Sequence, residues 1–445
     1  MYYCISYIIQ YDNKICQGYD RIFKKYITKK GGMIILKKSN SNLFLYPKIR
    51  WIYIPLGIII YICLGTVYSW SVFRKPLENL LNITATQSGI PYMLFLFFFS
   101  LFMAISGGFI NKFKPKYVII FGGLLVGLGW ILSGFLPQIN YISITYGIIA
   151  GSGVGIVYGV PIAVISRWFP DKRGLSMGLV ISGFGLSPLI TAPLARQLIS
   201  LYGPFNTFKI LGAIFIFLIT FTGFFFKFPS EKLDLKKTQS TQKRILSELN
   251  PKEMLKSPKF YGLWFCYLIG TLIGLMIIGI SSPVGEELVK LDPNITARLI
   301  SIFAIFNALG RPLFGWITDK LLPMKSAITS YILVIIGTLL MLLSQDRNPI
   351  FYIISFSLFW LILGAWLAIA PASTIILFGE KNYSKNYGIV FTAYGFGAII
   401  GVMISGMLRD IFGSYLYVFY LLIVLGILGI IIASTFLKDK SNLYG

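Results

Sequence analysis

Histidine is absent from this sequence of 445 residues, and acidic residues are scarce, with 16 Asp and Glu against 40 Lys and Arg. Each acidic residue lies in a polar segment or near the end of an apolar run, and none lies at the centre of such a run. Without histidine, the commonest proton shuttle and metal ligand is missing. Proton relays inside membranes usually need a carboxylate or a histidine. We therefore expect neither a metal site nor a dedicated proton relay.

Cysteine is also rare, and its spacing predicts no site. The four cysteines Cys4, Cys16, Cys63 and Cys266 are far apart and form no CxxC pair, so a zinc site or a redox pair is not indicated. The sequence has no glycine-rich loop ending in Lys-Ser or Lys-Thr, which excludes an ATP-driven pump within this chain. The apolar runs also lack the side-chain constellations of an intramembrane enzyme. No cofactor is predicted.

Long apolar runs dominate what is present: 56% of the residues are hydrophobic and the mean hydropathy is +0.76. A run of about 20 apolar residues is long enough to span a bilayer as a helix. The sequence therefore predicts an all-α polytopic membrane protein with twelve spans. They fall at about 51–73, 87–110, 117–137, 141–168, 174–200, 205–227, 259–281, 296–318, 326–345, 349–378, 386–409 and 413–437.

A polar, charged segment between the sixth and seventh spans divides the chain into two halves. The expected parts are a basic segment 1–50, a bundle 51–228, a linker 229–258, a second bundle 259–437 and a tail 438–445. Translation from Met33 in place of Met1 remains open. Most Lys and Arg lie in the segments that share a side with the N-terminus, so the positive-inside rule predicts two cytoplasmic termini in a plasma-membrane protein. The net charge of +24 is thus explained by topology, with no need for nucleic acid.

Two internal repeats support this division. The segment that begins at Gly107 matches the one that begins at Gly315, with partner residues 208 positions apart. The pairs are Asn111 with Asp319, Lys112 with Lys320, and Pro115 with Pro323. A second set of pairs, Pro161 with Pro371 and Gly178 with Gly388, is 210 positions apart. Such parallel repeats are typical of transporters built from two related six-helix halves.

On these residues the chain resembles the major facilitator superfamily, whose loop signature is similar to Gly315–Lys320 and, in degenerate form, to Gly107–Lys112. Three further segments are similar to the oxalate:formate antiporter family and its monocarboxylate-porter relatives. They read GTVYSWSVFRKPL from position 65, RWFPDKRGLSMGLVISGFGLSPLITAPL from position 167 and GRPLFGWITDK from position 310. The resemblance covers about 51–437 and implies twelve helices in two pseudo-symmetric six-helix bundles.

The resemblance also implies site residues. In that family an arginine of helix 8 binds the substrate carboxylate, which corresponds to Arg311 here. Dicarboxylate-binding members add a lysine in helix 11, but this chain has no Lys or Arg between Tyr387 and Arg409. Tyr394 is expected at that place. This departure favours a monocarboxylate over oxalate.

Arg311 is unusual by its position alone. It lies eight residues before Asp319, about 12 Å of helix, so it lies near the midplane if Asp319 marks the membrane edge, because half the hydrocarbon thickness is about 15 Å. A guanidinium there costs at least about 2.5–3.5 kcal/mol. It could bind a substrate carboxylate through its fixed fork of donors. Alternatively it is structural, donating to carbonyls freed by Pro312, chiefly that of Ala308, or snorkelling inward.

Other residues are candidates for the same cavity or for its gate. Asn307 lies one helical turn before Arg311 and could orient the guanidinium. The expected cavity-lining aromatic residues are Tyr68, Trp70, Tyr158, Trp366 and Tyr394. Each of them could equally be packing or an interface anchor. The expected latch at the inner side comprises Gly315, Asp319, Lys320, Asn111 and Lys112, with Asp319 accepting from the helix N-terminus of the opposite bundle.

The sequence therefore predicts a secondary transporter that moves a small organic anion, a monocarboxylate first of all, across the lipid bilayer by alternating access as a functional monomer. Antiport of one anion for another and symport of the weak acid with its own proton both remain open. Two alternatives remain. One is a carrier of a neutral or drug-like solute in which Arg311 is structural. The other is a non-transporting membrane sensor, which would need a folded signalling domain larger than the short linker and tails provide.

Overall fold

The computed structural model describes residues 27–30, 33–36, 48–106, 113–169, 173–229, 248–343, 348–379 and 381–438. The chain forms two units, Met1–Lys48 and Ile49–Gly445. In the first, strands β1 (Ile27–Lys30) and β2 (Met33–Leu36) pair antiparallel, with Ile27 opposite Leu36. The sequence reading did not predict this hairpin.

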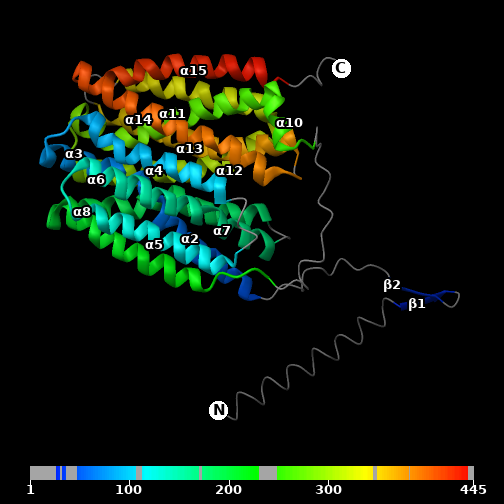
Figure 1. Ribbon diagram of the computed structural model, residues 1–445. Coiled ribbons are helices and arrows are strands. Elements are labelled where there is room, and N and C mark those ends of the chain that lie inside the picture. Colours follow the sequence, from blue (N-terminus) through cyan, green and yellow to red (C-terminus); the bar gives the residue numbers. More distant parts are fainter. Residues whose placement is uncertain are drawn as a thin grey trace, which may run out of the picture. The chain divides into compact units, whose positions relative to one another are not determined.

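The described residues in the first half of the second unit are mostly helical (Figure 1). Its elements are the 3-10 helix η2 (Lys48–Ile52), α2 (Tyr53–Gly65), the 3-10 helix η3 (Thr66–Ser69), α3 (Trp70–Leu81), α4 (Ala85–Ser106), α5 (Pro115–Ser133), α6 (Ile139–Ile142), the π-helix η4 (Ser143–Ala150), α7 (Gly151–Trp168) and α8 (Arg173–Phe224). The first crossing continues to Leu81, well past the expected end at position 73, because η3 joins α2 to α3 without a loop.

The second half is also built from long helices. Its elements are α10 (Pro251–Lys256), α11 (Pro258–Glu287), α12 (Pro293–Leu343), α13 (Pro349–Phe378), α14 (Tyr383–Phe412) and α15 (Leu416–Phe436). The first four begin with proline, whose missing N–H costs nothing in the first turn of a helix. The short helix α10 lies within the expected linker and starts with a capping box formed by Asn250 and Glu253.

Ten helical segments of the described chain are long and apolar enough to cross a membrane, and two of them hold two crossings each. Helix α8 breaks at Gly203 (φ 74°, ψ 167°) and α12 at Leu322 (φ 66°, ψ 167°), each directly before a proline. A straight helix of about 50 residues would be about 75 Å long, far more than the 30 Å hydrocarbon core. The breaks therefore turn the chain back, and the expected twelve crossings are confirmed.

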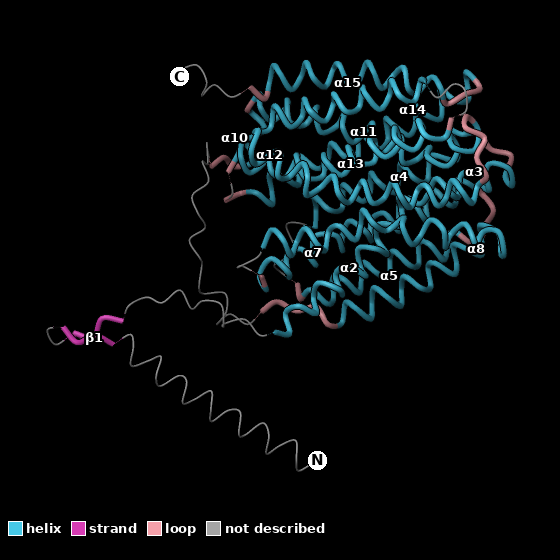
Figure 2. Tube along the Cα trace, turned by 180° about the vertical axis from the view of Figure 1, so that it is seen from behind, coloured by secondary structure: helices cyan, strands magenta, loops and turns pink. Residues whose placement is uncertain are grey.

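The helices run side by side, with their connections at the two ends of the bundle (Figure 2). Between the two halves, α4 packs on α14 and α8 packs on α12. Glycines set the closest crossings of α12 with α13: a Cβ on Gly364 would overlap the carbonyl oxygen of Asn307, and one on Gly310 would overlap that of Leu361. This close approach fixes the segment of α12 that carries Arg311.

Candidate functional site

Arg311 lies in the first crossing of α12, at the contact between the two bundles. Its side chain is 8% exposed, and its Nη1 donates to the carbonyl oxygen of Ile181 on α8 at 2.6 Å. The bond therefore joins the two bundles across the molecule. A purely structural arginine was expected to donate to Ala308 in its own helix, and the acceptor found lies in the opposite bundle instead.

The two other nitrogens of Arg311, Nε and Nη2, are buried and have no hydrogen-bond partner among the described residues. These two nitrogens lie on one edge of the planar guanidinium, so their N–H groups point in parallel. This edge matches the two oxygens of a carboxylate, which Arg binds in a bidentate manner. Leaving such donors buried without a partner costs free energy. The open edge is thus the chemical feature of Arg311 that a carboxylate would satisfy.

Arg74 on α3 is a second buried arginine, which was not predicted from the sequence. Unlike Arg311, it has a partner for each of its guanidinium nitrogens. It is fully buried, and its Nε donates to the Ser88 hydroxyl (2.9 Å) and its Nη1 to the Gly279 carbonyl (3.1 Å). Its Nη2 donates to the Ala85 carbonyl, and Glu78 lies one helical turn away with its carboxylate 3.7 Å from Nε. All three nitrogens of Arg74 are occupied by the protein, so it has no free edge to offer a ligand.

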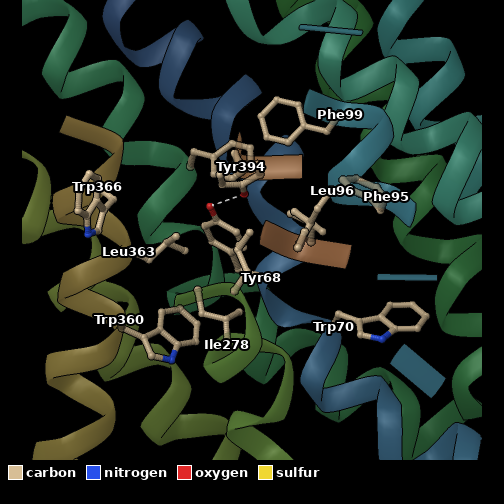
Figure 3. Packing of buried hydrophobic residues seen from close by; sticks show 14 of the residues in the cluster. Tyr68, Trp70, Phe95, Leu96, Phe99, Ile278, Trp360, Leu363, Trp366 and Tyr394 are labelled. Carbon is tan, nitrogen blue, oxygen red and sulfur yellow. Dashed lines mark hydrogen bonds between the residues drawn. The ribbon is translucent and has the colours of Figure 1, made fainter. Parts of the chain in front are cut away.

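Aromatic side chains from both bundles gather beside Arg311. The hydroxyl of Tyr68 on η3 and that of Tyr394 on α14 form a hydrogen bond of 2.9 Å (Figure 3). Phe184 on α8 packs edge-on against Tyr68 (5.1 Å between ring centroids) and Tyr158 on α7 (5.5 Å). Phe99 on α4 contacts Tyr158 and Tyr394. Three predicted residues, Tyr68, Tyr158 and Tyr394, are thereby brought into one cluster.

Arg311 lies near this cluster. Its side chain is in the vicinity of four buried tyrosines, Tyr61, Tyr68, Tyr158 and Tyr267. Tyr61 and Tyr267 were not predicted, because nothing in a sequence rich in tyrosine distinguishes them from packing residues. The site thus combines one cation with neutral tyrosine hydroxyls, although that of Tyr61 already donates to the Tyr158 carbonyl. A cation beside neutral hydroxyls is suited to holding an anion.

Two predicted residues, Trp70 and Trp366, each pack inside one bundle. Trp70 packs inside the first bundle against Phe73, Tyr146 and Phe208, and its indole N–H donates to the Ser88 carbonyl. Figure 3 shows it well apart from the pair Tyr68–Tyr394.

Trp366 packs inside the second bundle against Tyr267 and Tyr331. Its indole nitrogen is buried without a partner in the described part of the chain. Trp70 thus stacks on Tyr146, which is not one of the tyrosines near Arg311, whereas Trp366 stacks on Tyr267, which is one of them. Both assignments stay predictions.

Asn307 is next to Arg311 but engages other groups. Its Nδ2 donates to the Trp360 carbonyl on α13 at 3.0 Å, while its buried Oδ1 has no partner among the described residues. A Cβ on Gly185 of α8 would lie 2.6 Å from this Oδ1, so Asn307 packs at the contact between bundles. Its expected role in orienting the guanidinium stays a prediction.

The expected latch is described only in part. Asp319 is exposed, Gly315 has only the Ala368 side chain near its Cβ position, and the Lys320 ammonium lies 4.2 Å from the centroid of the Trp316 ring. Asn111 and Lys112 lie outside the described residues. The latch therefore remains a prediction.

Polar contacts close the other end of the molecule, the end that holds the connections α3–α4, α11–α12 and α14–α15; we name it the outer end. Lys75 on α3 pairs with Glu287 on α11, and Arg409 on α14 lies 3.4 Å from the same carboxylate. Asp410 on α14 accepts from the backbone N–H groups of Ala85 (3.0 Å) and Thr86 (2.9 Å) at the start of α4. A carboxylate at a helix N-terminus is favoured by the free N–H groups and the helix dipole. Together with Arg74, these contacts tie the two bundles at the outer end.

The sequence profile of the Major Facilitator Superfamily matches residues 56–377 and again residues 289–443. The oxalate:formate antiporter of Oxalobacter formigenes is 28% identical over 371 residues, which cover 82% of this chain and 86% of the relative. Monocarboxylate transporter 12 of Xenopus laevis is 28% identical over 336 residues, covering 70% of this chain and 72% of that protein.

Solved structures share the fold. A bacterial homologue of the human lysosomal transporter Spinster, in an inward-facing and unoccupied conformation, superposes with a TM-score of 0.65 at 14% identity, covering 87% of this chain and 96% of the other. The nucleoside transporter NupG superposes with a TM-score of 0.67 at 12% identity, covering 87% and 100%. The profile match over most of the chain establishes that it belongs to the Major Facilitator Superfamily, a family of membrane transporters and not of enzymes.

Proposed function

We propose that this protein is a secondary transporter of a small organic anion, most simply a monocarboxylate, that works by alternating access. Two relatives bear the names oxalate:formate antiporter and monocarboxylate transporter, and both names describe carriers of small carboxylates. The proposal includes the orientation expected from the sequence, with both chain termini in the cytoplasm of a plasma-membrane protein and the outer end facing away from it.

The observation that carries the proposal is the open edge of Arg311. A buried guanidinium with Nε and Nη2 unpaired holds a charge that only an anion neutralises, and the tyrosine hydroxyls beside it add neutral donors. The aromatic rings of Phe99, Phe184 and Tyr394 would contact the apolar part of a monocarboxylate. A free cation in the empty site would disfavour the occluded state without substrate. The cycle is therefore expected to favour exchange of one anion for another over net flow.

The bundles must separate and rejoin around this site. In the present conformation they are joined near it by the bonds Arg311–Ile181 and Tyr68–Tyr394. A carboxylate on the open edge would leave the Ile181 bond in place, whereas rocking of the bundles would break it. Arg311 would thus serve both as the binding cation and as a contact that differs between the two conformations.

The direct test is a thermal-shift and competition panel on the purified, reconstituted protein. Small monocarboxylates, such as formate, acetate and lactate, are expected to stabilise the protein and to compete for uptake, since a ligand that binds the native state raises its stability. Their amides have nearly the same shape but no charge and serve as the matched control. Stabilisation by amides or neutral sugars equal to that by the acids would contradict the proposal and favour a carrier of neutral solutes.

A second prediction concerns the outer end. Asp410→Asn is expected to weaken its closure because the helix N-terminus of α4 loses its anionic acceptor; losing such a cap costs about 0.5–2 kcal/mol, and the exposure of Asp410 places the effect near the lower value. A Ser71→Cys reporter, buried in the wild-type protein, should then react about two- to fivefold faster with a membrane-impermeant maleimide.

The control for this variant is Asp292→Asn at the same end, whose carboxylate accepts from the backbone N–H of Asn294 at the start of α12. It removes the same charge and the same kind of helix-start acceptor, but this bond lies within one bundle. Equal labelling rates in the two variants would rule out a role of Asp410 in closure.

A further inference from the structure

Two adjoining pockets lie where α4 ends, α5 begins and α8 ends. One has a volume of about 430 Å³ and the other of about 510 Å³, within the range of about 300–1,000 Å³ typical of ligand sites. Phe113 lines both of them, so they form one continuous surface. Neither includes Arg311 or the tyrosine cluster, and nothing in the proposed transport cycle uses them.

The first pocket, here named the apolar groove, is lined by side chains of α4, α5 and α7 and by Phe113. They are Phe102, Ile105, Ser106, Tyr117, Val118, Phe121 and Ile156. Tyr117 and Phe121 are each 58% exposed, so the groove opens on the outer surface of the helix bundle. Because α4, α5 and α7 are membrane-spanning, this surface faces hydrocarbon, and an acyl chain is the occupant that fits such a wall.

The second pocket, here named the basic pocket, differs in charge. It is lined by Lys114, Lys116 and Lys227, together with Pro115 and the aromatic residues Phe113, Phe224, Phe226 and Phe228. No acidic side chain is among the lining residues that the structure describes. Lys116 lies with its ammonium 4.7 Å from the centroid of the Tyr117 ring, at the boundary between the two pockets. The charge therefore lies at the membrane edge, directly beside the mouth of the groove.

We propose that this surface binds an anionic phospholipid, with its phosphate in the basic pocket and an acyl chain in the apolar groove. Basic pockets between membrane helices bind the head groups of anionic lipids, and each nearby Lys adds about 1 kcal/mol of attraction. A free phosphate would use the lysines but not the groove. A neutral lipid would use the groove but leave three cations without a counterion. Only a lipid that carries net negative charge can fill the apolar groove and neutralise the basic pocket at once.

The site joins α5 to the end of α8 within the first bundle. A lipid held there would therefore strengthen the contact between α5 and α8, two helices that pack closely along their length. The proposal does not depend on the identity of the transported solute. It would stand if the thermal-shift panel of carboxylates failed.

The test measures lipid binding to the full-length protein by native mass spectrometry and thermal shift. The probes are dioleoyl phosphatidylglycerol, dioleoyl phosphatidylcholine and glycerol phosphate, which is a head group without chains. Phosphatidylglycerol is expected to bind and stabilise the wild type, and the other two to bind at least tenfold more weakly. The triple variant Lys114→Gln, Lys116→Gln, Lys227→Gln should lose most of the preference for phosphatidylglycerol.

The matched control is Lys252→Gln, Lys256→Gln, Lys385→Gln, which removes the same charge from residues outside both pockets. It should bind phosphatidylglycerol as the wild type does. If both triple variants bound phosphatidylglycerol equally weakly, general surface charge would explain the effect and the proposal would be overturned. Unchanged binding by the variant of Lys114, Lys116 and Lys227 would overturn it too.

A further variant, Val118→Trp, fills the apolar groove and should weaken phosphatidylglycerol binding without changing that of glycerol phosphate. If glycerol phosphate instead bound the wild type as tightly as the lipid, the site would be one for a free phosphate and the proposal would be overturned.

Discussion

Arg311→Ala is expected to reduce uptake of the carboxylate substrate into proteoliposomes by at least about 30-fold. Truncating one partner of a buried, hydrogen-bonded charge pair costs about 2–5 kcal/mol, and the lower figure already corresponds to about 30-fold. Arg311→Lys should retain a small part of the activity, because the ammonium keeps the charge but lacks the two parallel N–H groups of the open edge.

The matched control for Arg311→Ala is Arg298→Ala, in the same helix and with the same change of charge, but at an exposed position. Uptake by this variant should stay near that of the wild type. Arg311→Ala should also lose the stabilisation by carboxylates while remaining folded, as judged by its elution on size exclusion and its melting in the absence of ligand. Normal uptake by Arg311→Ala would show that Arg311 is not the cation that binds the substrate.

Arg74→Ala is expected to have the largest effect on stability. It removes the guanidinium next to Glu78, which keeps only Lys75 (3.6 Å) and the Ser88 hydroxyl. It also frees the carbonyls of Gly279 and Ala85 in a buried setting, and breaking a buried charge pair costs about 3–5 kcal/mol. Since the Gly279 carbonyl belongs to the opposite bundle, the loss should also open the outer end. A lower melting temperature and faster labelling of the Ser71→Cys reporter are the expected results.

Arg196→Ala provides the comparison for Arg74→Ala. Arg196 on α8 also reaches the other bundle, through Asn294 at 3.4 Å, but it does so where solvent competes. Its removal should change stability by less than about 1 kcal/mol, as for surface polar pairs. If Arg74→Ala and Arg196→Ala melted alike, burial of the Arg74 contacts would not be what holds the outer end.

Several features of the protein were predictable because they depend on local chemistry alone. A run of about 20 apolar residues must span a bilayer as a helix, so the twelve crossings follow from the sequence. The two turns inside α8 and α12 fall in the predicted gaps between spans, at 201–204 and 319–325. Arg311 was visible for a related reason, since a cation inside an apolar run is conspicuous whatever surrounds it.

The burial of Arg74 was not predicted, because the charged neighbours Lys75 and Glu78 make this segment resemble the polar end of a span. The pattern that could have found it is the spacing of four between Arg74 and Glu78, which places the two charges on one helix face. In a water-soluble helix, a face with these two charges would be expected to face the solvent. The contact with Gly279 on α11, far along the chain, is what buries it.

The sequence by itself determined the membrane-spanning helices, the two related halves and the cation in α12, because each follows from hydropathy, charge or repetition along the chain. Only the tertiary structure decided that Tyr68 and Tyr394 meet, that Trp70 and Trp366 pack within separate bundles, and that Arg311 has an open edge while Arg74 has none. The physical reason is that a hydrogen-bonding group is defined by its partners. The partners of a buried side chain come from helices that are neighbours in space and distant in sequence.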